Sequence, residues 1–284
     1  MASNDTSSNA HTADSDGLEF WRIKRLRFRV LILGRANAGK TTILERIAGA
    51  SICEAEVWRD GKRLPGQIVK GQSDRGLHNV KDEIRFPSRP GFVFHDSRGF
   101  EAGSSKELAV AQQFVEDSAA VTSLREQLHA IWMCLPLDEA RELFDTEKQV
   151  FSWARGHIPL VVIFTKRDGA VDKVTSQIIS SASESASGRA FRKKARENAE
   201  IAVATHIKER EEELRQLDQV AQGKSAMTFL ATSDMAEPTD ASKSACANLI
   251  KATEEGLAGP KLKTVLSLVW GRNLLENGFR CFLW

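Results

Sequence analysis

The chain has 284 residues, of which 42% are hydrophobic and 27% charged, and its formal net charge is +2 at pH 7. This length suits one large α/β domain with insertions or two small domains, and the composition is that of a soluble globular protein. The small net charge argues against a dedicated nucleic-acid surface. No apolar run of about 18 residues could span a membrane and no signal peptide opens the chain, so we expect a cytoplasmic protein.

Two features of the composition limit the chemistry further. Residues 1–20 are rich in Ser, Asn, Asp, Thr and Ala, which predicts a disordered N-terminal lead. The cysteines show neither a CxxC pair nor the spacing of metal ligands. We therefore expect free thiols at Cys53, Cys134, Cys246 and Cys281.

A phosphate-binding motif follows the first predicted strand. A β-branched and apolar run predicts this strand over about residues 26–33. The sequence GRANAGKT at Gly34–Thr41 fits GxxxxGK[ST] and leads into a predicted helix that ends near Ala48. Strand, loop and helix in this order form the context in which the pattern binds phosphate.

Each residue type in this loop has a physical role towards an anion. Glycines allow successive backbone N–H groups to point at one phosphate, and the helix N-terminus adds its positive end. Lys40 would neutralise charge on the β- and γ-phosphates and is the candidate catalytic group, and Thr41 would ligate Mg²⁺. The predicted phosphate contacts are Gly34, Asn37, Ala38, Gly39, Lys40, Thr41 and Thr42.

A second motif is predicted at the end of an antiparallel hairpin. Residues 50–78 look irregular, whereas strands over about 80–86 and 92–95 flank a Pro- and Gly-containing turn. The second of these strands ends in the DxxG sequence Asp96-Ser97-Arg98-Gly99. Asp96 would hold Mg²⁺ through its water shell, and the Gly99 N–H would contact the γ-phosphate.

The rest of the chain continues to alternate between helix and strand. A helix carrying Leu108, Phe114 and Val115 is predicted to continue through Leu124 and Leu128. Buried strands are then predicted over residues 130–135, 158–165 and 227–232. This alternation favours a largely parallel sheet that is covered on both faces.

Two further strand ends carry residues suited to a purine base. The strand at 158–165 runs into Thr165-Lys166-Arg167-Asp168, which is TKxD. Asp168 would accept hydrogen bonds from guanine N1–H and the 2-amino group, a donor pair that adenine lacks, so the site would disfavour ATP. Lys166 would lay its stem over the base. The predicted base contacts are Thr165, Lys166, Asp168, Ala231, Thr232 and Ser233.

Residues 171–226 form an insertion in this alternation. A Ser-rich piece precedes a charged helix predicted over about 189–222, with an apolar stripe and the pairs Lys193–Glu197, Arg196–Glu200 and Glu211–Arg215. The stripe consists of Val203, Ile207, Leu214 and Leu217. Two interpretations stay open: a solvated helix packed on its own domain, or a helix that binds a partner.

The segment 261–284 predicts one or two amphipathic helices. The first interpretation is a final helix packed against the sheet. Association with a membrane surface and dimerisation are the alternatives.

Taken together, the four motifs resemble those of the translation-factor-related P-loop GTPases over about residues 26–170 and 226–256. Asn37 within GRxNxGK[ST] is similar to the Era-like branch, whereas TKxD and the insertion resemble AIG1-type GTPases and fungal G domain-containing proteins. The resemblance implies a three-layer α/β/α, Ras-like P-loop NTPase fold with a mostly parallel six-stranded sheet and one antiparallel strand. It places the G domain over residues 21–284, with GTP or GDP and Mg²⁺ as cofactors.

Two positions depart from the pattern of that class. Phe100 stands where Ras-like members use a glutamine to orient the attacking water, so hydrolysis is expected to be slow. Between Thr42 and Thr122 no threonine is available as the usual Mg²⁺ ligand, which leaves Ser73 or His78 as candidates. The resemblance also suggests activation by K⁺ through Asn37.

The sequence therefore predicts a Mg²⁺-dependent guanine-nucleotide-binding protein with slow or partner-stimulated GTP hydrolysis. The alternative is a non-hydrolysing, GTP- or GDP-bound scaffold whose 189–222 helix binds a protein partner. A protein effector and a nucleotide-dependent homodimer are both open as partners.

Overall fold

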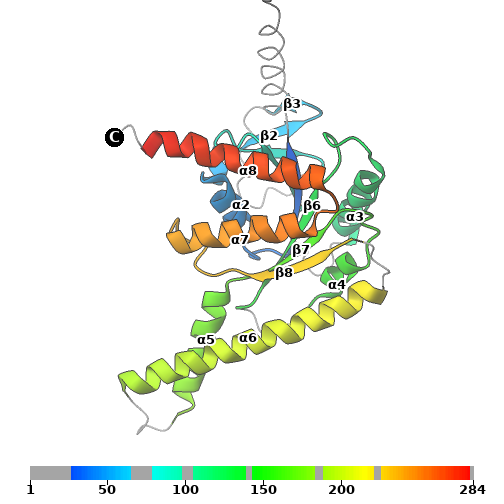
Figure 1. Ribbon diagram of the computed structural model, residues 1–284. Helices are drawn as coiled ribbons and strands as arrows, with labels where there is room; N and C mark the ends of the chain where they lie inside the picture. Colours follow the sequence, from blue (N-terminus) through cyan, green and yellow to red (C-terminus); the bar gives the residue numbers. More distant parts are fainter. Residues whose placement is uncertain are drawn as a thin grey trace, which may run out of the picture.

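The computed structural model describes residues 27–64, 79–97, 105–138, 143–182, 188–220 and 225–281, with side chains of the last helix described to residue 271. Eight strands form one sheet in the order β3-β2-β4-β5-β1-β6-β7-β8. Figure 1 shows helices on both faces of this sheet. The predicted three-layer α/β/α fold is confirmed.

Five strands at the centre and one edge of the sheet are parallel. They are β5 (Phe92–Asp96), β1 (Phe28–Leu33), β6 (Ala130–Pro136), β7 (Leu160–Thr165) and β8 (Met227–Ala231). Because parallel strands end at the same edge, the residues that follow β1, β5, β7 and β8 share one side of the molecule. The described residues of all four predicted motifs lie on that side.

The predicted hairpin is confirmed, but the predicted number of strands was wrong. β4 (Glu83–Arg85) pairs antiparallel with β5. Two more strands, β2 (Glu56–Arg59) and β3 (Lys62–Arg63), lie in the stretch predicted to be irregular and extend the sheet beyond β4. Their turn is Asp60-Gly61, with φ angles of 50° and 75°. An Asp-Gly pair with two positive φ angles is a strong hairpin signal, which the sequence contained.

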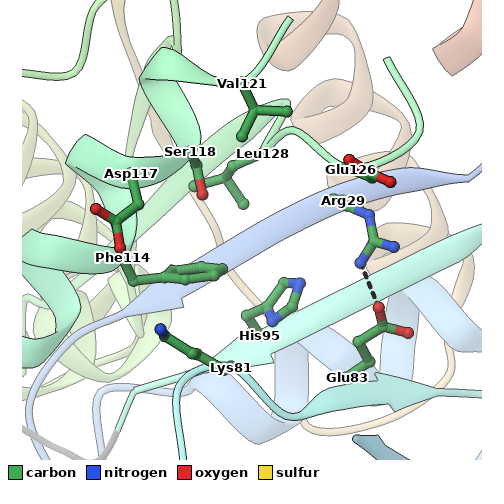
Figure 2. A pocket seen from close by; sticks show the side chains of 10 residues that line it. All are labelled: Arg29, Lys81, Glu83, His95, Phe114, Asp117, Ser118, Val121, Glu126 and Leu128. Atoms are coloured by element: carbon green, nitrogen blue, oxygen red, sulfur yellow. Dashed lines mark hydrogen bonds and ion pairs between the residues drawn. The ribbon is translucent and has the colours of Figure 1, made fainter. Parts of the chain in front are cut away.

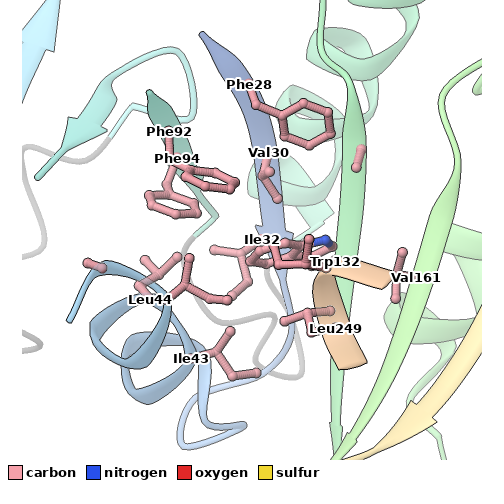
Figure 3. Packing of buried hydrophobic residues seen from close by; sticks show 14 of the residues in the cluster. Phe28, Val30, Ile32, Ile43, Leu44, Phe92, Phe94, Trp132, Val161 and Leu249 are labelled. Carbon is pink, nitrogen blue, oxygen red and sulfur yellow. The ribbon is translucent and has the colours of Figure 1, made fainter. Parts of the chain in front are cut away.

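One face of the sheet is covered by α2 (Lys40–Ala48), α7 (Asp240–Gly256) and α8 (Pro260–Cys281). Figure 3 shows Ile43 and Leu44 of α2 and Leu249 of α7 around Ile32 and Trp132 of the sheet. The inner part of α8 joins this core, as predicted for a final helix. Its buried side chains are Leu262, Val265, Leu266 and Val269.

The other face is covered by α3 (Ser105–Ala120), α4 (Asp145–Phe151) and part of α6 (Arg189–Val220). The prediction that α3 continues through Leu124 and Leu128 was wrong, because the helix ends at Ala120. The next residues are Val-Thr-Ser, whose β-branched and hydroxyl side chains disfavour helix. Leu128 is nevertheless buried, as the residue that leads into β6.

The predicted insertion at 171–226 contains most of α5 (Arg167–Ser180) and the whole of α6, and these two helices pack against each other and extend from the body of the molecule in Figure 1. The predicted long helix is confirmed, and members of its apolar stripe are buried against the domain. Of the predicted pairs within α6, Lys193–Glu197 is present at 3.9 Å. The pairing of Arg196 with Glu200 was wrong, since both pair with α5 instead, with Asp172 and Arg167 respectively.

Candidate functional site

The loop between β1 and α2 has the backbone that the phosphate-binding motif requires. Gly34 has a φ of 142°, and a Cβ there would lie 2.6 Å from the carbonyl oxygen of Cys134, so only glycine fits. Gly39 and Asn37 also have positive φ angles, of 85° and 61°. This succession of left-handed residues turns the backbone sharply just before the N-terminus of α2.

Lys40 is held over this loop by the loop itself. Its ammonium donates hydrogen bonds to the carbonyl oxygens of Gly34, at 2.8 Å, and Arg35, at 3.0 Å. Thr41 is exposed and Thr42 half-buried in the first turn of α2, and that turn contains no acidic residue. A cation, two hydroxyls and the positive end of a helix dipole therefore meet at one place, which suits a polyphosphate.

A buried hydrogen bond connects the TKxD segment to the phosphate-binding loop. The Thr165 hydroxyl donates to the carbonyl oxygen of Ala38 at 2.9 Å, and both residues are almost fully buried. A Cβ on Gly39 would lie 3.5 Å from the Thr165 side chain. Two loops that are 127 residues apart in the chain are thus in direct contact.

The residues after Thr165 turn abruptly into α5. Lys166 adopts a left-handed conformation with φ 58°, and its ammonium lies 3.0 Å from Oδ2 of Asp138. Asp168 is half-buried in the first turn of α5. Thr165 contacts the phosphate-binding loop, and Asp168 follows that contact by three residues.

The predicted third loop, after β8, lies beside the TKxD segment. The backbone N–H of Thr232 donates to the Phe164 carbonyl at 2.8 Å, and the N–H of Arg167 donates to the Thr232 carbonyl at 3.1 Å. Thr232 is buried, Ser233 half-buried and Ala231 exposed. The structure therefore brings the three sequence-predicted loops together.

Asp96 ends β5 opposite Ile32, so it is next to the start of the phosphate-binding loop. The N–H and hydroxyl of the following Ser97 donate to the Ile32 carbonyl at 3.2 and 3.3 Å, which fixes this strand end. The other predicted residues of the switch regions lie outside the described residues. They are Gly99, Phe100, Ser73 and His78.

Cys134 closes the floor beneath the loop. Burial raises the pKa of its thiol to about 12, against a smaller opposing effect of the Lys40 charge. The side chain is therefore a neutral thiol at pH 7 and serves as packing under Gly34, not as a nucleophile. Within the described ranges no group of three or more His, Cys, Asp or Glu side chains is placed to hold a metal.

These residues fit a nucleotide with one hard cation. A Mg²⁺ ion bound here would draw on the Thr41 hydroxyl, the Asp96 carboxylate, phosphate oxygens and water, which is the donor set that this ion prefers. Gly34 has no Cβ to clash with the Cys134 carbonyl, so the loop packs directly on β6. The sequence missed Asp138, although it too follows a strand end at this edge of the sheet.

Comparisons with known proteins give little beyond this geometry. No protein-family model and no curated protein matches the sequence. Among solved structures, the chain is similar to an ADP-ribosylation-factor-like GTP-binding protein, the small COPII coat GTPase SAR1 from Encephalitozoon cuniculi, in complex with GDP. The identity is 13%, the TM-score is 0.37, and the match covers 95% of this chain and 94% of that chain. A likeness at this level assigns neither a ligand nor an activity.

In the described part of the chain, no helix is both long enough and apolar enough to cross a lipid bilayer.

Proposed function

We propose that this chain binds GTP and GDP together with Mg²⁺ and hydrolyses GTP slowly or with the help of a partner. The observation that carries the proposal is the hydrogen bond from the Thr165 hydroxyl to the Ala38 carbonyl. It joins a loop suited to phosphates to a segment suited to guanine. If Gly34–Thr41 were only a glycine-rich turn in an unrelated fold, a hydrogen bond to a TKxD segment would not be expected.

Different residues bind the phosphates, the ion and the base. Lys40 and the backbone N–H groups of residues 34–42 bind the phosphates, and Lys40 offsets charge that builds up on the β–γ bridge during hydrolysis. Thr41 and Asp96 hold the ion, whose charge supplies the remaining stabilisation. Asp168 accepts the two guanine donors, and the loop at 231–233 offers backbone groups to the guanine oxygen.

Slow hydrolysis follows from what the chain lacks. Phe100 has no group that could orient water, and none of the residues assigned to the phosphates or the ion is suited to act as a catalytic base. Activity would then need a group from a protein effector or from a second copy of the chain, or K⁺ at Asn37. We place the G domain over residues 21–284, with the insertion at 171–226, in a cytoplasmic protein. The finer placement in the Era-like or AIG1-like branches rests on sequence motifs alone.

Identification of the co-purifying nucleotide by mass, followed by titration with a fluorescent GDP, tests the proposal. Lys40→Ala should weaken GDP binding by about two orders of magnitude or more, because a charge-assisted contact with phosphate is lost. Lys243→Ala removes an exposed lysine of α7 that pairs with Asp240 and is the matched control. Tight GDP binding by Lys40→Ala would contradict the assignment of the loop.

Base selectivity is a separate test. Asp168→Asn should reduce the preference for GDP over ADP by a few kcal/mol, since the carboxylate no longer matches two donors. Asp172→Asn lies one turn later on α5, where Asp172 pairs with Arg196, and should leave the preference unchanged. If ADP competes equally with GDP in the wild type, the guanine site is refuted even when the phosphate loop is correct.

A non-hydrolysing scaffold is the second candidate, and α6 is the observation that favours it. This 32-residue helix extends from the body of the molecule and exposes Ile201 to 66%, so it offers a long surface to a partner. A single-turnover rate no faster than that of free GTP in KCl, NaCl and at high protein concentration would support the scaffold. A measurable rate in any of the three conditions would favour the GTPase.

A further inference from the structure

A cavity of about 320 Å³ lies under the C-terminal half of α3, away from the loops described above. Figure 2 shows it between α3, the start of β1, the hairpin strands β4 and β5, and the turn that leads into β6. A volume of this size is at the lower end of ligand pockets and suits a side chain or a small molecule. None of the nucleotide-site residues lines it.

The polar side chains on the floor and on one wall of the cavity already form hydrogen bonds within the protein. Arg29 donates from Nη1 to Glu83 at 2.6 Å and from Nε to the Arg125 carbonyl at 2.9 Å, and the dashed line in Figure 2 marks the first of these bonds. His95 forms the floor, is 3% exposed, and bonds through Nδ1 to the Val80 carbonyl at 3.0 Å. These groups shape the cavity but have little capacity left for an anion.

Ser118 has unused hydrogen-bonding capacity. The residue is only 6% exposed, and its hydroxyl points into the cavity in Figure 2. Within the part of the chain that the structure describes, this hydroxyl makes no hydrogen bond, although a helical serine commonly bonds to the preceding turn. The Ser118 oxygen is not one of the fully enclosed polar atoms that lack a partner, so it is open to the cavity and can bond there to water or to a polar group of a ligand.

Exposed acidic side chains outnumber basic ones on the rim. Asp117 and Glu126 are exposed carboxylates that line it, and Lys81 is the opposing cation. Asp117 lies near the C-terminal end of α3, where the helix dipole is negative and where the last turn carries no basic residue. Its carboxylate accepts one hydrogen bond, from Gln113 at 2.8 Å, and retains capacity for more.

Phe114 lies one turn before Asp117 on the same face of α3 and presents its ring to the cavity in Figure 2. The ring and the His95 imidazole contact each other at 4.9 Å between centroids. An aromatic face beside a carboxylate binds planar cations, by a cation–π contact on one side and hydrogen bonds on the other.

We propose that this cavity, the α3 pocket, binds a guanidinium or amidinium group carried on an apolar stem. The group stacks on Phe114, donates to Asp117 and Glu126, and donates to the Ser118 hydroxyl. A guanidinium has five N–H donors in one plane, so it can satisfy a carboxylate and a hydroxyl together. A compact ammonium would use the ring and one carboxylate but not the full set.

Three small probes of equal shape test the charge of the ligand. Phenylguanidine, neutral phenylurea and anionic benzoate are titrated separately into the ¹⁵N-labelled full chain and followed by NMR. Phenylguanidine should shift the amides of Phe114, Asp117 and Ser118 and bind about five-fold or more tightly than phenylurea. Benzoate should cause no shifts there. Equal binding of the guanidine and the urea, or preferential binding of benzoate, would overturn the proposal.

Matched variants test the location. Asp117→Asn should raise the dissociation constant of phenylguanidine about five-fold, because it removes a charged hydrogen-bond acceptor. Glu116→Gln removes the same charge from the neighbouring position of α3, where Glu116 bonds to Gln112 and does not line the cavity. It should have no more than a weak effect. Lys81→Gln removes the repelling cation and should tighten binding about two-fold. Equal effects of the two carboxylate variants, or weaker binding by Lys81→Gln, would refute the site.

The source of the guanidinium is read from two further probes. Blocked arginine, N-acetyl-arginine amide, represents a free small cation, and a nine-residue peptide with one central arginine represents a segment of a protein partner. Tighter binding of the peptide assigns the α3 pocket to a partner, and equal binding assigns it to a small molecule. Either result supports the proposed chemistry, whereas binding of neither probe contradicts it. All arms are independent of nucleotide and therefore of the function proposed above.

Discussion

Removal of one hydroxyl should separate the two halves of the candidate nucleotide site. Thr165→Val keeps the shape of the side chain but removes the donor to the Ala38 carbonyl. Thr165 is 3% exposed and Ala38 is 1% exposed, so no solvent can replace the lost bond. An unpaired buried carbonyl costs about 1–3 kcal/mol. We therefore expect the free energy of unfolding to fall by about 2 kcal/mol.

Thermal and urea denaturation measure this change. At about 2–4 °C per kcal/mol for a chain of this size, the Tm should fall by about 4–8 °C. The affinity for GDP should fall about tenfold in addition, because the loops are no longer held in place before the nucleotide binds.

Thr175→Val is the matched control. The Thr175 hydroxyl bonds to the Val171 carbonyl at 2.7 Å within α5, so its loss should cost no more than about 0.5 kcal/mol. Equal destabilisation by the two variants would refute the special role of the bond between the loops. Destabilisation by Thr165→Val without loss of GDP affinity would confine that role to folding.

Three further predictions concern the phosphate loop and the buried titratable groups. Gly34→Ala places a Cβ 2.6 Å from the Cys134 carbonyl oxygen and should abolish GDP binding. The control is Gly49→Ala, where φ is 65° and the space around the residue is open, and it should lower stability by only about 1 kcal/mol. Normal GDP binding by Gly34→Ala would contradict the loop geometry. Burial lowers the pKa of His129 to about 4, from 6.5. Its contribution to the free energy of unfolding, up to about 3 kcal/mol, is therefore present above pH 6.5 and is lost as the pH falls towards 4. The stability difference between wild type and His129→Leu, measured in urea, should shrink over that interval, and a constant difference would show that the histidine is not buried as a neutral group. Burial also lowers the pKa of Arg89, whose Nε and Nη1 have no hydrogen-bond partner in the described ranges. Arg89→Met should therefore raise the free energy of unfolding by about 1 kcal/mol. A lower urea midpoint would contradict this and show that the cation–π contact with Trp270 of α8 outweighs the cost of burying the charge.

The sequence predicted the parts of the fold that depend on local pattern. The strands β1, β6 and β7 are apolar except for Arg29 and the terminal Thr165, and the loop at Gly34–Thr41 has a residue spacing that few other structures require. Parallel strands end at one edge, so the grouping of the candidate site followed from the order of the motifs. None of these inferences needed a long-range contact.

The misplaced elements are those whose sequence signal is weak or ambiguous. The short strands β2 and β3 contain few apolar residues, and their hairpin is signalled only by Asp60-Gly61. The end of α3 depends on the three residues after Ala120, since the apolar spacing continues to Leu128. The partners of Arg196 depend on α5, which the spacing within α6 cannot reveal.

Side-chain contacts between distant segments could not be predicted from the sequence either. The ion pair of Lys166 with Asp138 and the bond from Thr165 to Ala38 require the fold to bring separate strand ends together. The α3 pocket depends in the same way on segments from residues 29 to 128. Local pattern indicates which residue types are present at an edge, but not which atoms meet there.

The crossover from β7 to β8 leaves the sheet after Thr165 and, because the two strands are parallel, returns at the opposite edge before Met227. The two strands are held together without it, by Leu160 N–H to the Ala226 carbonyl at 2.9 Å where they start and by Arg167 N–H to the Thr232 carbonyl at 3.1 Å where they end. Lengthening a connection between strands that are already paired costs little, about 0.6 kcal/mol for each doubling of a flexible loop. Evolution could thus enlarge, trim or replace the helical hairpin while the neighbouring loops keep their geometry. This connection is accordingly the place where a tag or reporter domain could be inserted with least disturbance.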